Sequence, residues 1–278
     1  MKISDSSPPQ GNTTAILLIG NSGAGKSTLL SQLGGNFESG VKFREGCTKD
    51  IYEMSAIVDG NKVVLMDVPG LFEPDDKETE YNASKLTEAL KRGYSYMLYF
   101  VLEATNRGPS NEEMVMMSKV NACVRQAGSK AVFRVIVNQI KSKGVYDIYN
   151  KHLAQDNCKS LFHSMKMEGF SFDITVTGVL MLMYDEKAIE GNQLRHWLEK
   201  DIQMHQSAPV SLEKDIKASN KDIKLFVLAV GALYAVGTVG AAVAIGTVGS
   251  AGMAGVGAVV GIVLLVHQLL KNIKEKEI

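Results

Sequence analysis

The residue types between positions 20 and 27, GNSGAGKS, suit the binding of a phosphate chain. The segment matches Gly-x-x-x-x-Gly-Lys-Ser, follows the apolar run 14–19 and precedes a predicted helix over 26–33. Glycines let the backbone curl so that N–H groups point at phosphate oxygens, and the helix N-terminus adds positive potential. In such a loop the lysine reaches the β- and γ-phosphates and the serine hydroxyl ligates Mg²⁺. The predicted nucleotide-binding residues are Gly20, Asn21, Ser22, Gly23, Ala24, Gly25, Lys26, Ser27 and Thr28.

A second pattern, DVPG at residues 67–70, ends the apolar run 62–68. Asp67 follows Lys26 by 41 positions (67 − 26 = 41). An aspartate at the tip of a strand beside the phosphate loop can hold Mg²⁺, usually through water. Gly70 can turn its backbone N–H toward the γ-phosphate and sense whether that group is present. Asp-x-x-Gly alone most often marks a turn, but its place on a strand at this spacing favours a metal and phosphate site.

The segment between these two patterns, residues 37–50, is polar, contains glycine and has no clear periodicity. We interpret it as a switch loop. Thr48 lies just before a predicted strand and is the candidate for the second hydroxyl on Mg²⁺, beside Ser27 and Asp67. The alternative is an ordinary surface-loop threonine.

Apolar runs alternate with helical patterns as far as about residue 205, which indicates a mainly parallel sheet covered on both faces. The tripeptide Asp59-Gly60-Asn61 predicts a hairpin and so one antiparallel pair. We therefore expect an α/β P-loop fold of three layers, α/β/α, with a mostly parallel six-stranded sheet. Strands are predicted at 14–19, 51–58, 62–68, 95–102, 131–137 and 172–176, and helices at 26–33, 82–91, 111–126, 146–167 and 186–204.

The phosphate-loop segment GNSGAGKSTLL, followed by DVPGLFE, resembles the septin-related GTPases. The likeness is strongest to the immunity-associated (avirulence-induced) and chloroplast-import-receptor branch. The segment YFVLEATNRGPSNEE, residues 99–113, matches that branch at Arg107, Ser110, Glu112 and Glu113. Ser110 and Glu113 also form a helix capping box, which is a purely structural explanation for them.

The resemblance spans about residues 14–204 and implies a Mg²⁺-dependent GTPase that binds GTP and GDP. The predicted catalytic residues are Lys26, Thr48 and Gly70, from the motifs above, and Arg107, which the resemblance implies. The resemblance also implies that two nucleotide domains pair across their bound nucleotides, so that the chain is a homodimer or oligomer. Arg107 is then a trans-acting group or, equally, a surface arginine.

The sequence departs from the usual GTPase pattern in its base-recognition and hydrolysis positions. Asn138 stands where the guanine box Asn-Lys-x-Asp begins, but Lys141 replaces the aspartate, and lysine cannot accept hydrogen bonds from guanine. The last box is expected at Thr177-Gly178, after the sixth strand. Leu71 replaces the glutamine that orients water in many small GTPases, so we expect slow hydrolysis that depends on dimerisation.

The C-terminal third has a different composition. Residues 225–270 hold no Asp, Glu, Lys or Arg over 46 positions (270 − 225 + 1 = 46), and lysines flank both ends. That length accommodates two membrane spans of about 20 residues with both ends cytoplasmic. The alternative is a soluble helical subdomain or dimerisation arm. Before it, 206–224 is predicted as a linker with an amphipathic helix over Ser211–Lys224.

The balanced charge, with 30 basic and 30 acidic residues, argues against a nucleic-acid partner. Three scattered cysteines exclude a disulfide framework. The expected domains are a leader at 1–13, a GTPase domain at 14–205, the linker at 206–224, the glycine-rich apolar hairpin at 225–270 and a charged tail at 271–278.

The favoured hypothesis is a membrane-associated guanine-nucleotide switch whose nucleotide domain lies in the cytoplasm. Two alternatives stay open. One is an ATP-using P-loop enzyme, which Lys141 favours. The other is a membrane-perturbing effector that nucleotide licenses.

Overall fold

The computed structural model describes residues 13–34, 48–58, 60–105, 109–126, 129–147, 174–183, 191–204 and 207–228. By its internal contacts the chain divides into two compact units, Met1–Asn220 and Lys221–Ile278. The first unit contains the sheet and every residue of the candidate site that the structure describes.

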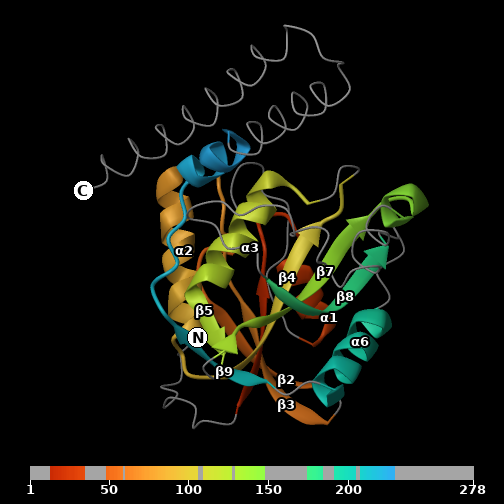
Figure 1. The fold of residues 1–278 in the computed structure, drawn as a ribbon. Helices are drawn as coiled ribbons and strands as arrows, with labels where there is room; N and C mark the ends of the chain where they lie inside the picture. The colour runs from red at the N-terminus through yellow and green to blue at the C-terminus, as the bar shows by residue number, and fades with distance from the viewer. Residues whose placement is uncertain are drawn as a thin grey trace, which may run out of the picture. The chain divides into compact units, whose positions relative to one another are not determined.

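Six strands form the main sheet of the first unit, in the order β2-β3-β1-β4-β7-β8 (Figure 1). Neighbouring strands are parallel except β2 and β3, which form the predicted hairpin. The fold class predicted for this part, an α/β P-loop fold, is therefore confirmed. The strand bounds are β1 Thr14–Ile19, β2 Tyr52–Val58, β3 Asn61–Asp67, β4 Ser95–Glu103, β7 Val132–Ile140 and β8 Thr175–Met183.

The central strands are buried because helices cover both faces of the sheet (Figure 1). Ile16 of β1 packs in one core cluster with Leu29 and Leu198, so α1 and α6 share a face. On the opposite face, the Tyr96 hydroxyl of β4 donates to the Ala89 carbonyl of α2. The helix bounds are α1 Lys26–Gln32, α2 Asp76–Leu90, α3 Asn111–Cys123 and α6 Gly191–Met204.

Three short strands extend the sheet beyond the predicted six, and they correct two predictions. The helix expected to reach Gln126 ends at Cys123 and is followed by β5, Val124–Gln126. The linker and amphipathic helix expected over 206–224 are wrong in part: β9, Ala208–Leu212, pairs antiparallel with β4 and β5, and residues 220–228 are helical. The third strand is β6, Ser129–Lys130.

The extension has a simple cause in the strand register. Strand β7 pairs with β4 only from Leu98 onward, which leaves the first residues of β4 with a free edge. Strand β9 occupies that edge, with Pro209 opposite Ser95 and Ala208 opposite Tyr96. Main-chain groups at a buried edge need hydrogen-bond partners, so this short segment becomes a strand.

The predicted leader, the charged tail and most of the predicted apolar hairpin lie outside the described residues, as does most of the helix expected over 146–167. Within the described ranges, no helix is long and apolar enough to cross a membrane.

Candidate nucleotide-binding site

The phosphate loop joins β1 to α1 at the carboxyl end of the sheet, and its glycines are required by backbone conformation or by close contacts. Gly23 and Gly25 have φ of +83° and +86°, which side chains rarely adopt. A Cβ on Gly25 would lie 2.6 Å from Asn138 Nδ2, and one on Gly20 would lie 2.5 Å from the Val101 carbonyl oxygen. The loop is therefore held between the ends of β4 and β7.

Lys26 lies at the centre of this loop and is buried, with 6% of its surface exposed. Its Nζ donates to the carbonyls of Gly20 and Asn21, both at 3.1 Å. Burial lowers the pKa of Lys26, while the nearby carboxylates of Asp67 and Glu73 act in the opposite direction. The ammonium group is thus enclosed where a phosphate chain would follow the loop.

The structure brings together the three residues predicted to hold Mg²⁺. Ser27 Oγ donates to Asp67 Oδ2 at 2.6 Å, and Thr48 Oγ1 donates to the same oxygen at 2.9 Å. The two hydroxyls are 3.1 Å apart. Asp67 is 1% exposed, and its Oδ1 has no hydrogen-bond partner among the described residues. A buried carboxylate oxygen without a partner, beside two hydroxyls, is the oxygen donor set that Mg²⁺ prefers.

The segment after Asp67 contacts the phosphate loop directly. Leu71 N–H donates to the Gly20 carbonyl at 3.3 Å, and Asn82 of α2 donates to the Gly70 carbonyl at 2.6 Å. A Cβ on Gly70 would overlap the backbone nitrogen of Ser22, so only glycine fits there. The Leu71 side chain is buried in the core. It therefore cannot orient an attacking water molecule, as its apolar character already indicated.

Glu73 is a site residue that the sequence reasoning missed. Its Oε1 accepts a hydrogen bond from the Ser22 hydroxyl of the phosphate loop. Thr79 Oγ1 accepts from the Glu73 backbone N–H at 3.0 Å, which fixes the segment. Burial raises the pKa of Glu73, and its charge acts on Lys26. The sequence signal that could have identified Glu73 is its place three positions after Gly70.

The base side of the site is built from the end of β7. Asn138 Nδ2 donates to the Ala24 carbonyl at 2.9 Å, and its buried Oδ1 has no hydrogen-bond partner within the described part of the chain. Gln139, also missed from sequence, donates through Nε2 to the Gly23 carbonyl at 2.7 Å. Its φ of +62° turns the chain at this point. Lys141 follows the end of β7 and is exposed.

The predicted last base box at Thr177 and Gly178 is misplaced. Both residues lie inside β8, and Gly178 pairs with Arg134, four positions before Asn138 on the neighbouring strand. A Cβ on Gly178 would lie 3.4 Å from Trp197, so this glycine serves helix packing. Strand β8 begins and ends later than its apolar run predicted, so the pair lies within the strand and away from its carboxyl end.

The other predicted residues fall in different places. Thr28 lies on α1 and is exposed, and Asn21 takes part through its carbonyl. Arg107 lies outside the described residues. Ser110 and Glu113 form the capping box at the start of α3, as their spacing indicated. Glu113 also accepts from the Glu103 N–H at 2.6 Å, and burial raises its pKa to about 7.

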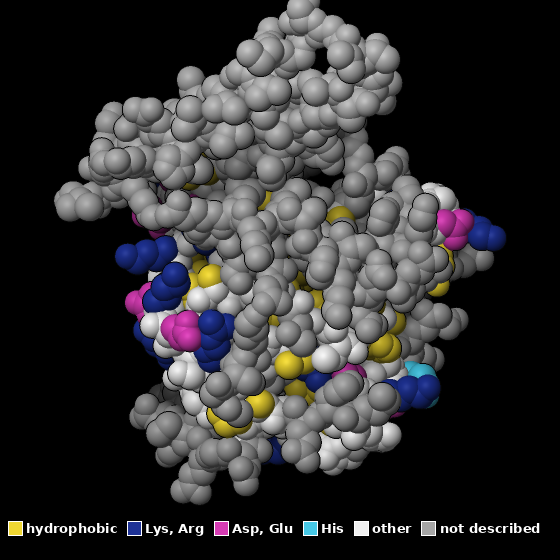
Figure 2. Space-filling view, viewed as in Figure 1, with side chains coloured by type: hydrophobic (Ala, Val, Ile, Leu, Met, Phe, Trp, Pro, Cys, Tyr) yellow, Lys and Arg dark blue, Asp and Glu magenta, His cyan; other side chains and the backbone are white. Residues whose placement is uncertain are grey.

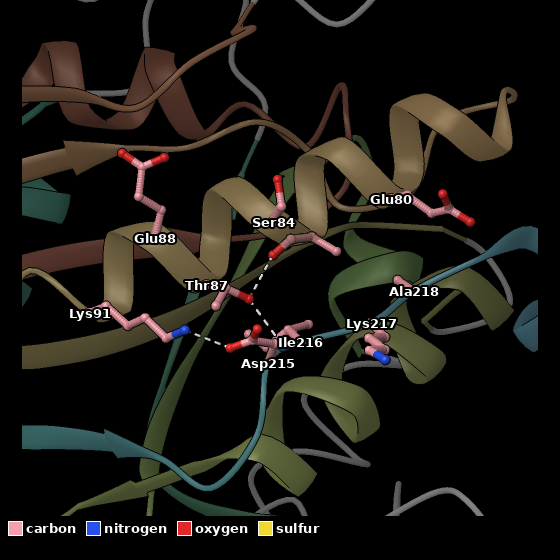
Figure 3. A pocket seen from close by; sticks show the side chains of 10 residues that line it. Glu80, Ser84, Thr87, Glu88, Lys91, Asp215, Ile216, Lys217 and Ala218 are labelled. Carbon is pink, nitrogen blue, oxygen red and sulfur yellow. Dashed lines mark hydrogen bonds and ion pairs between the residues drawn. The ribbon is translucent and has the colours of Figure 1, made fainter.

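A separate cavity of about 520 Å³ lies along α2, against residues 215–218 (Figure 3). Thr87 accepts a hydrogen bond from the Ile216 N–H at 3.0 Å, and Lys91 pairs with Asp215 at 2.6 Å. None of the residues predicted for nucleotide binding lines it. It is therefore not part of the candidate site.

Comparisons with known proteins find similarity to GTPases over part of the chain. Residues 15–139 match the model of a family described as 50S ribosome-binding GTPase. The tRNA modification GTPase MnmE of Phenylobacterium zucineum (strain HLK1) is 30% identical over 122 residues, which are 42% of this chain and 27% of that protein. MnmE of Chelativorans sp. (strain BNC1) is 34% identical over 99 residues, 36% of this chain and 22% of that protein. The chain thus matches about a quarter of the length of these relatives.

Two solved structures illustrate the structural likeness. A variant of Era from Aquifex aeolicus, bound to GDP·AlF4⁻, is 16% identical with a TM-score of 0.47, covering 69% of this chain and 57% of that one. Toc33 from Arabidopsis thaliana, in complex with GDP and Mg²⁺, is 16% identical with a TM-score of 0.43, covering 73% and 89%.

The fold and the phosphate loop define an α/β P-loop nucleotide-binding domain, and its residues 15–139 match the GTPase family model. Within the first unit it comprises the main sheet and the helices on its two faces.

Proposed function

We propose that the chain is a Mg²⁺-dependent guanine-nucleotide switch of the immunity-associated and chloroplast-import-receptor branch. The observation that carries the proposal is the group of Ser27, Thr48 and Asp67 beside the buried Lys26 ammonium. Mg²⁺ held there would neutralise charge on the β- and γ-phosphates. The loop amides and Lys26 would position the phosphate chain, because phosphoryl transfer depends mainly on positioning and electrostatic stabilisation.

Calorimetry with GTP and GDP, with Mg²⁺ and with EDTA, tests this proposal. Ser27→Ala should remove most of the gain in GTP affinity that Mg²⁺ confers on the wild type. Ser31→Ala is the matched control, because its hydroxyl lies one turn along α1 and donates to the Ser27 carbonyl. A wild-type chain that does not bind GTP with Mg²⁺ would refute the proposed function.

We further propose that hydrolysis is slow and depends on pairing of two nucleotide domains. The buried Leu71 supports this, because the position that carries a water-orienting side chain in many GTPases faces the core here. Arg107 is the proposed trans-acting group. Single-turnover hydrolysis measured over a hundredfold range of protein concentration decides the matter: a rate per molecule that stays constant excludes the dimer mechanism.

An adenine nucleotide is the second candidate ligand. The specific observation is the exposed Lys141 after β7, at the position of the guanine-binding carboxylate. A lysine can donate to an acceptor on adenine, but it cannot accept from guanine. Competition of labelled GTP against unlabelled ATP separates the two: displacement by ATP at equal concentration supports the adenine alternative.

For the C-terminal segment, 225–270, we propose membrane attachment that depends on nucleotide, with the nucleotide domain in the cytoplasm. The uncharged composition of this segment supports attachment. Asn220, just before it, donates through Nδ2 to the carbonyls of Glu73 and Pro74, at 3.0 and 3.1 Å. The chain that leads into the segment is therefore tied to the residue that contacts the phosphate loop.

Liposome partition of the full chain and of a chain that ends at residue 224 tests the attachment, with GDP and with a non-hydrolysable GTP analogue. Equal partition of the two chains would end the proposal. Dye leakage from the same vesicles distinguishes a membrane-perturbing effector from an anchored switch: binding without leakage favours anchoring.

A further inference from the structure

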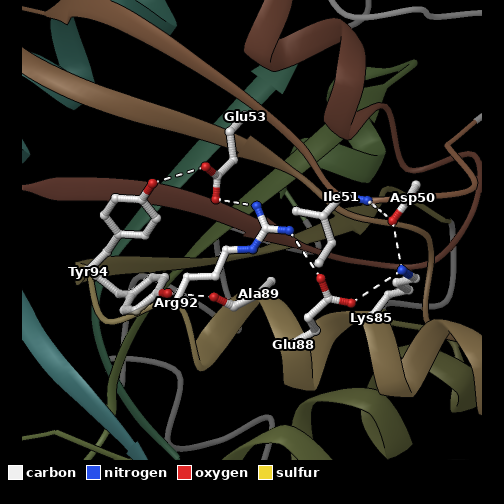
Figure 4. A network of polar contacts seen from close by, with 9 residues as sticks. Asp50, Ile51, Glu53, Lys85, Glu88, Ala89, Arg92 and Tyr94 are labelled. Atoms are coloured by element: carbon white, nitrogen blue, oxygen red, sulfur yellow. Dashed lines mark hydrogen bonds and ion pairs between the residues drawn. The ribbon is translucent and has the colours of Figure 1, made fainter. Parts of the chain in front are cut away.

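A row of alternating charges joins the start of β2 to helix α2 (Figure 4). Lys85 of α2 pairs with Asp50 at 2.9 Å and with Glu88 at 3.2 Å. Arg92 continues the row, pairing with Glu88 at 3.2 Å and with Glu53 of β2 at 2.7 Å. Each cation in this β2–α2 charge row therefore lies between two carboxylates.

One end of the charge row lies close in sequence to the candidate metal site. Asp50 follows Thr48 by two positions, and Thr48 donates to Asp67. Asp50 Oδ1 also accepts from the Ile51 N–H at 2.8 Å. The Asp50 carboxylate thus contacts both the Ile51 N–H and the Lys85 ammonium, two positions along the chain from Thr48.

The same helix holds the second segment that faces the phosphates. Asn82 of α2 donates to the Gly70 carbonyl at 2.6 Å. Asn82 and Lys85 are three positions apart, so they are neighbours on one helix face. Helix α2 therefore contacts both the segment that carries Thr48, through Asp50, and the Gly70 segment.

Lys85 is not one of the apolar residues that pack helix α2 into the core. Helix α2 is attached to the sheet by buried apolar residues such as Ala83, Leu86 and Leu90. Lys85 is 18% exposed, and its ammonium lies 5.4 Å from the centre of the Tyr81 ring. Basic and acidic side chains gather on the flank where α2 lies (Figure 2). Isolated surface ion pairs contribute little, whereas networks of charges contribute more.

We propose that Lys85 is a positioning residue for the magnesium site: it holds Asp50, and through Asp50 it keeps the Thr48 hydroxyl next to Asp67. The inference rests on the proposed function, since it concerns the same metal. It predicts that loss of the Lys85 charge weakens Mg²⁺ binding and leaves the phosphate loop intact.

The test is a Mg²⁺ titration of GTP binding by the full chain. Lys85→Met keeps the length of the stem and removes the charge; it should raise the Mg²⁺ concentration at half-saturation about three- to fivefold, in the range of charge-network effects. Affinity for GDP in EDTA should not change. Lys85→Arg should restore the wild-type titration. Asp50→Asn should act like Lys85→Met, and the double variant should be no worse than either, because both remove one interaction.

Lys91→Met is the matched control, since Lys91 follows α2 and pairs with Asp215, away from Thr48. Its Mg²⁺ titration should equal that of the wild type. The inference is overturned if Lys85→Met leaves half-saturation unchanged, if Lys91→Met shifts it equally, or if the two single-variant effects add. A wild type whose GTP binding ignores Mg²⁺ would instead refute the proposed function, so the two failures are distinguishable.

Discussion

The two sides of the candidate site are built in different ways. On the phosphate side, at the ends of β1 and β3, side chains from three separate segments meet at one carboxylate oxygen, Asp67 Oδ2. On the base side, at the end of β7, Asn138 and Gln139 contact carbonyls of the phosphate loop, and Lys141 lies exposed beyond them.

The difference shows what each side requires. Phosphate and metal recognition needs convergent backbone and oxygen groups, so a single change there disturbs several contacts. Base recognition, under the proposed function, would rest on individual side chains at the end of β7 and just after it. One of them, Lys141, can differ from the usual carboxylate while Asn138 still holds the loop. Variants on the two sides should therefore alter different properties: total nucleotide affinity on one, and choice of base on the other.

The largest effect is expected for Lys26→Ala on the phosphate side. Lys26 is enclosed by the loop, and removal of one partner from a buried, hydrogen-bonded charge pair weakens binding by about a hundredfold. GTP affinity measured by calorimetry should fall by about that factor. Lys143→Ala, an exposed lysine after β7, should bind GTP like the wild type. An intact affinity for Lys26→Ala would show that this loop does not hold the phosphates.

The next effect concerns Lys141→Asp on the base side. A carboxylate there can accept hydrogen bonds from guanine, so the ratio of GTP to ATP affinity should rise about tenfold to a hundredfold. Competition binding measures the ratio directly. Lys143→Asp makes the same charge change two positions further along and should leave the ratio unchanged. If both variants change the ratio equally, the change comes from the net charge near the site and not from a contact with the base.

A smaller effect is expected for Glu73→Gln. The Glu73 carboxylate lies beside Ser22 and acts on Lys26, so its charge opposes a third phosphate. Its neutralisation should raise the affinity for GTP relative to GDP about threefold, as expected for a partly exposed charge pair. Because burial raises the pKa of Glu73, acidification should shift the wild type in the same direction. The Gln variant should lack this pH dependence; the same dependence in both proteins would assign it to another group.

The smallest effect on nucleotide affinity is expected at Glu113, which belongs to neither side. Its pKa of about 7 in the folded chain exceeds the ordinary 4.5, so the folded state binds this proton more tightly. Proton binding at Glu113 therefore stabilises the folded state most below about pH 4.5, and this stabilisation is lost as pH rises through about 7.

Urea unfolding at pH 5 and pH 8 measures that stabilisation. Glu113→Gln cannot titrate at this position. The free energy of unfolding of the wild type, relative to that of the variant, should therefore fall between pH 5 and pH 8. Glu112→Gln, its exposed neighbour, is the control and should follow the wild type at both values. A difference that does not change with pH would show that Glu113 stays in one protonation state across this range.

Local patterns in the sequence determined the phosphate loop, Asp67, the hairpin and the buried strands. Each of these depends on residues that are near one another in the chain: a glycine spacing, a carboxylate at a strand end, or an apolar run. The structure placed Ser27, Thr48 and Asp67 together because parallel strands bring their carboxyl ends to one edge of the sheet.

Only the tertiary structure decided which other side chains reach the loop. Glu73 meets Ser22 and Gln139 meets Gly23 across long separations, and β9 occupies an edge of β4 that β7 leaves free. An apolar run reveals a strand but neither its register nor its neighbour. That is why Thr177 and Gly178 were assigned to the end of a strand when they lie within it. Contacts of this kind follow from strand order and helix packing, which no short segment of the chain encodes by itself.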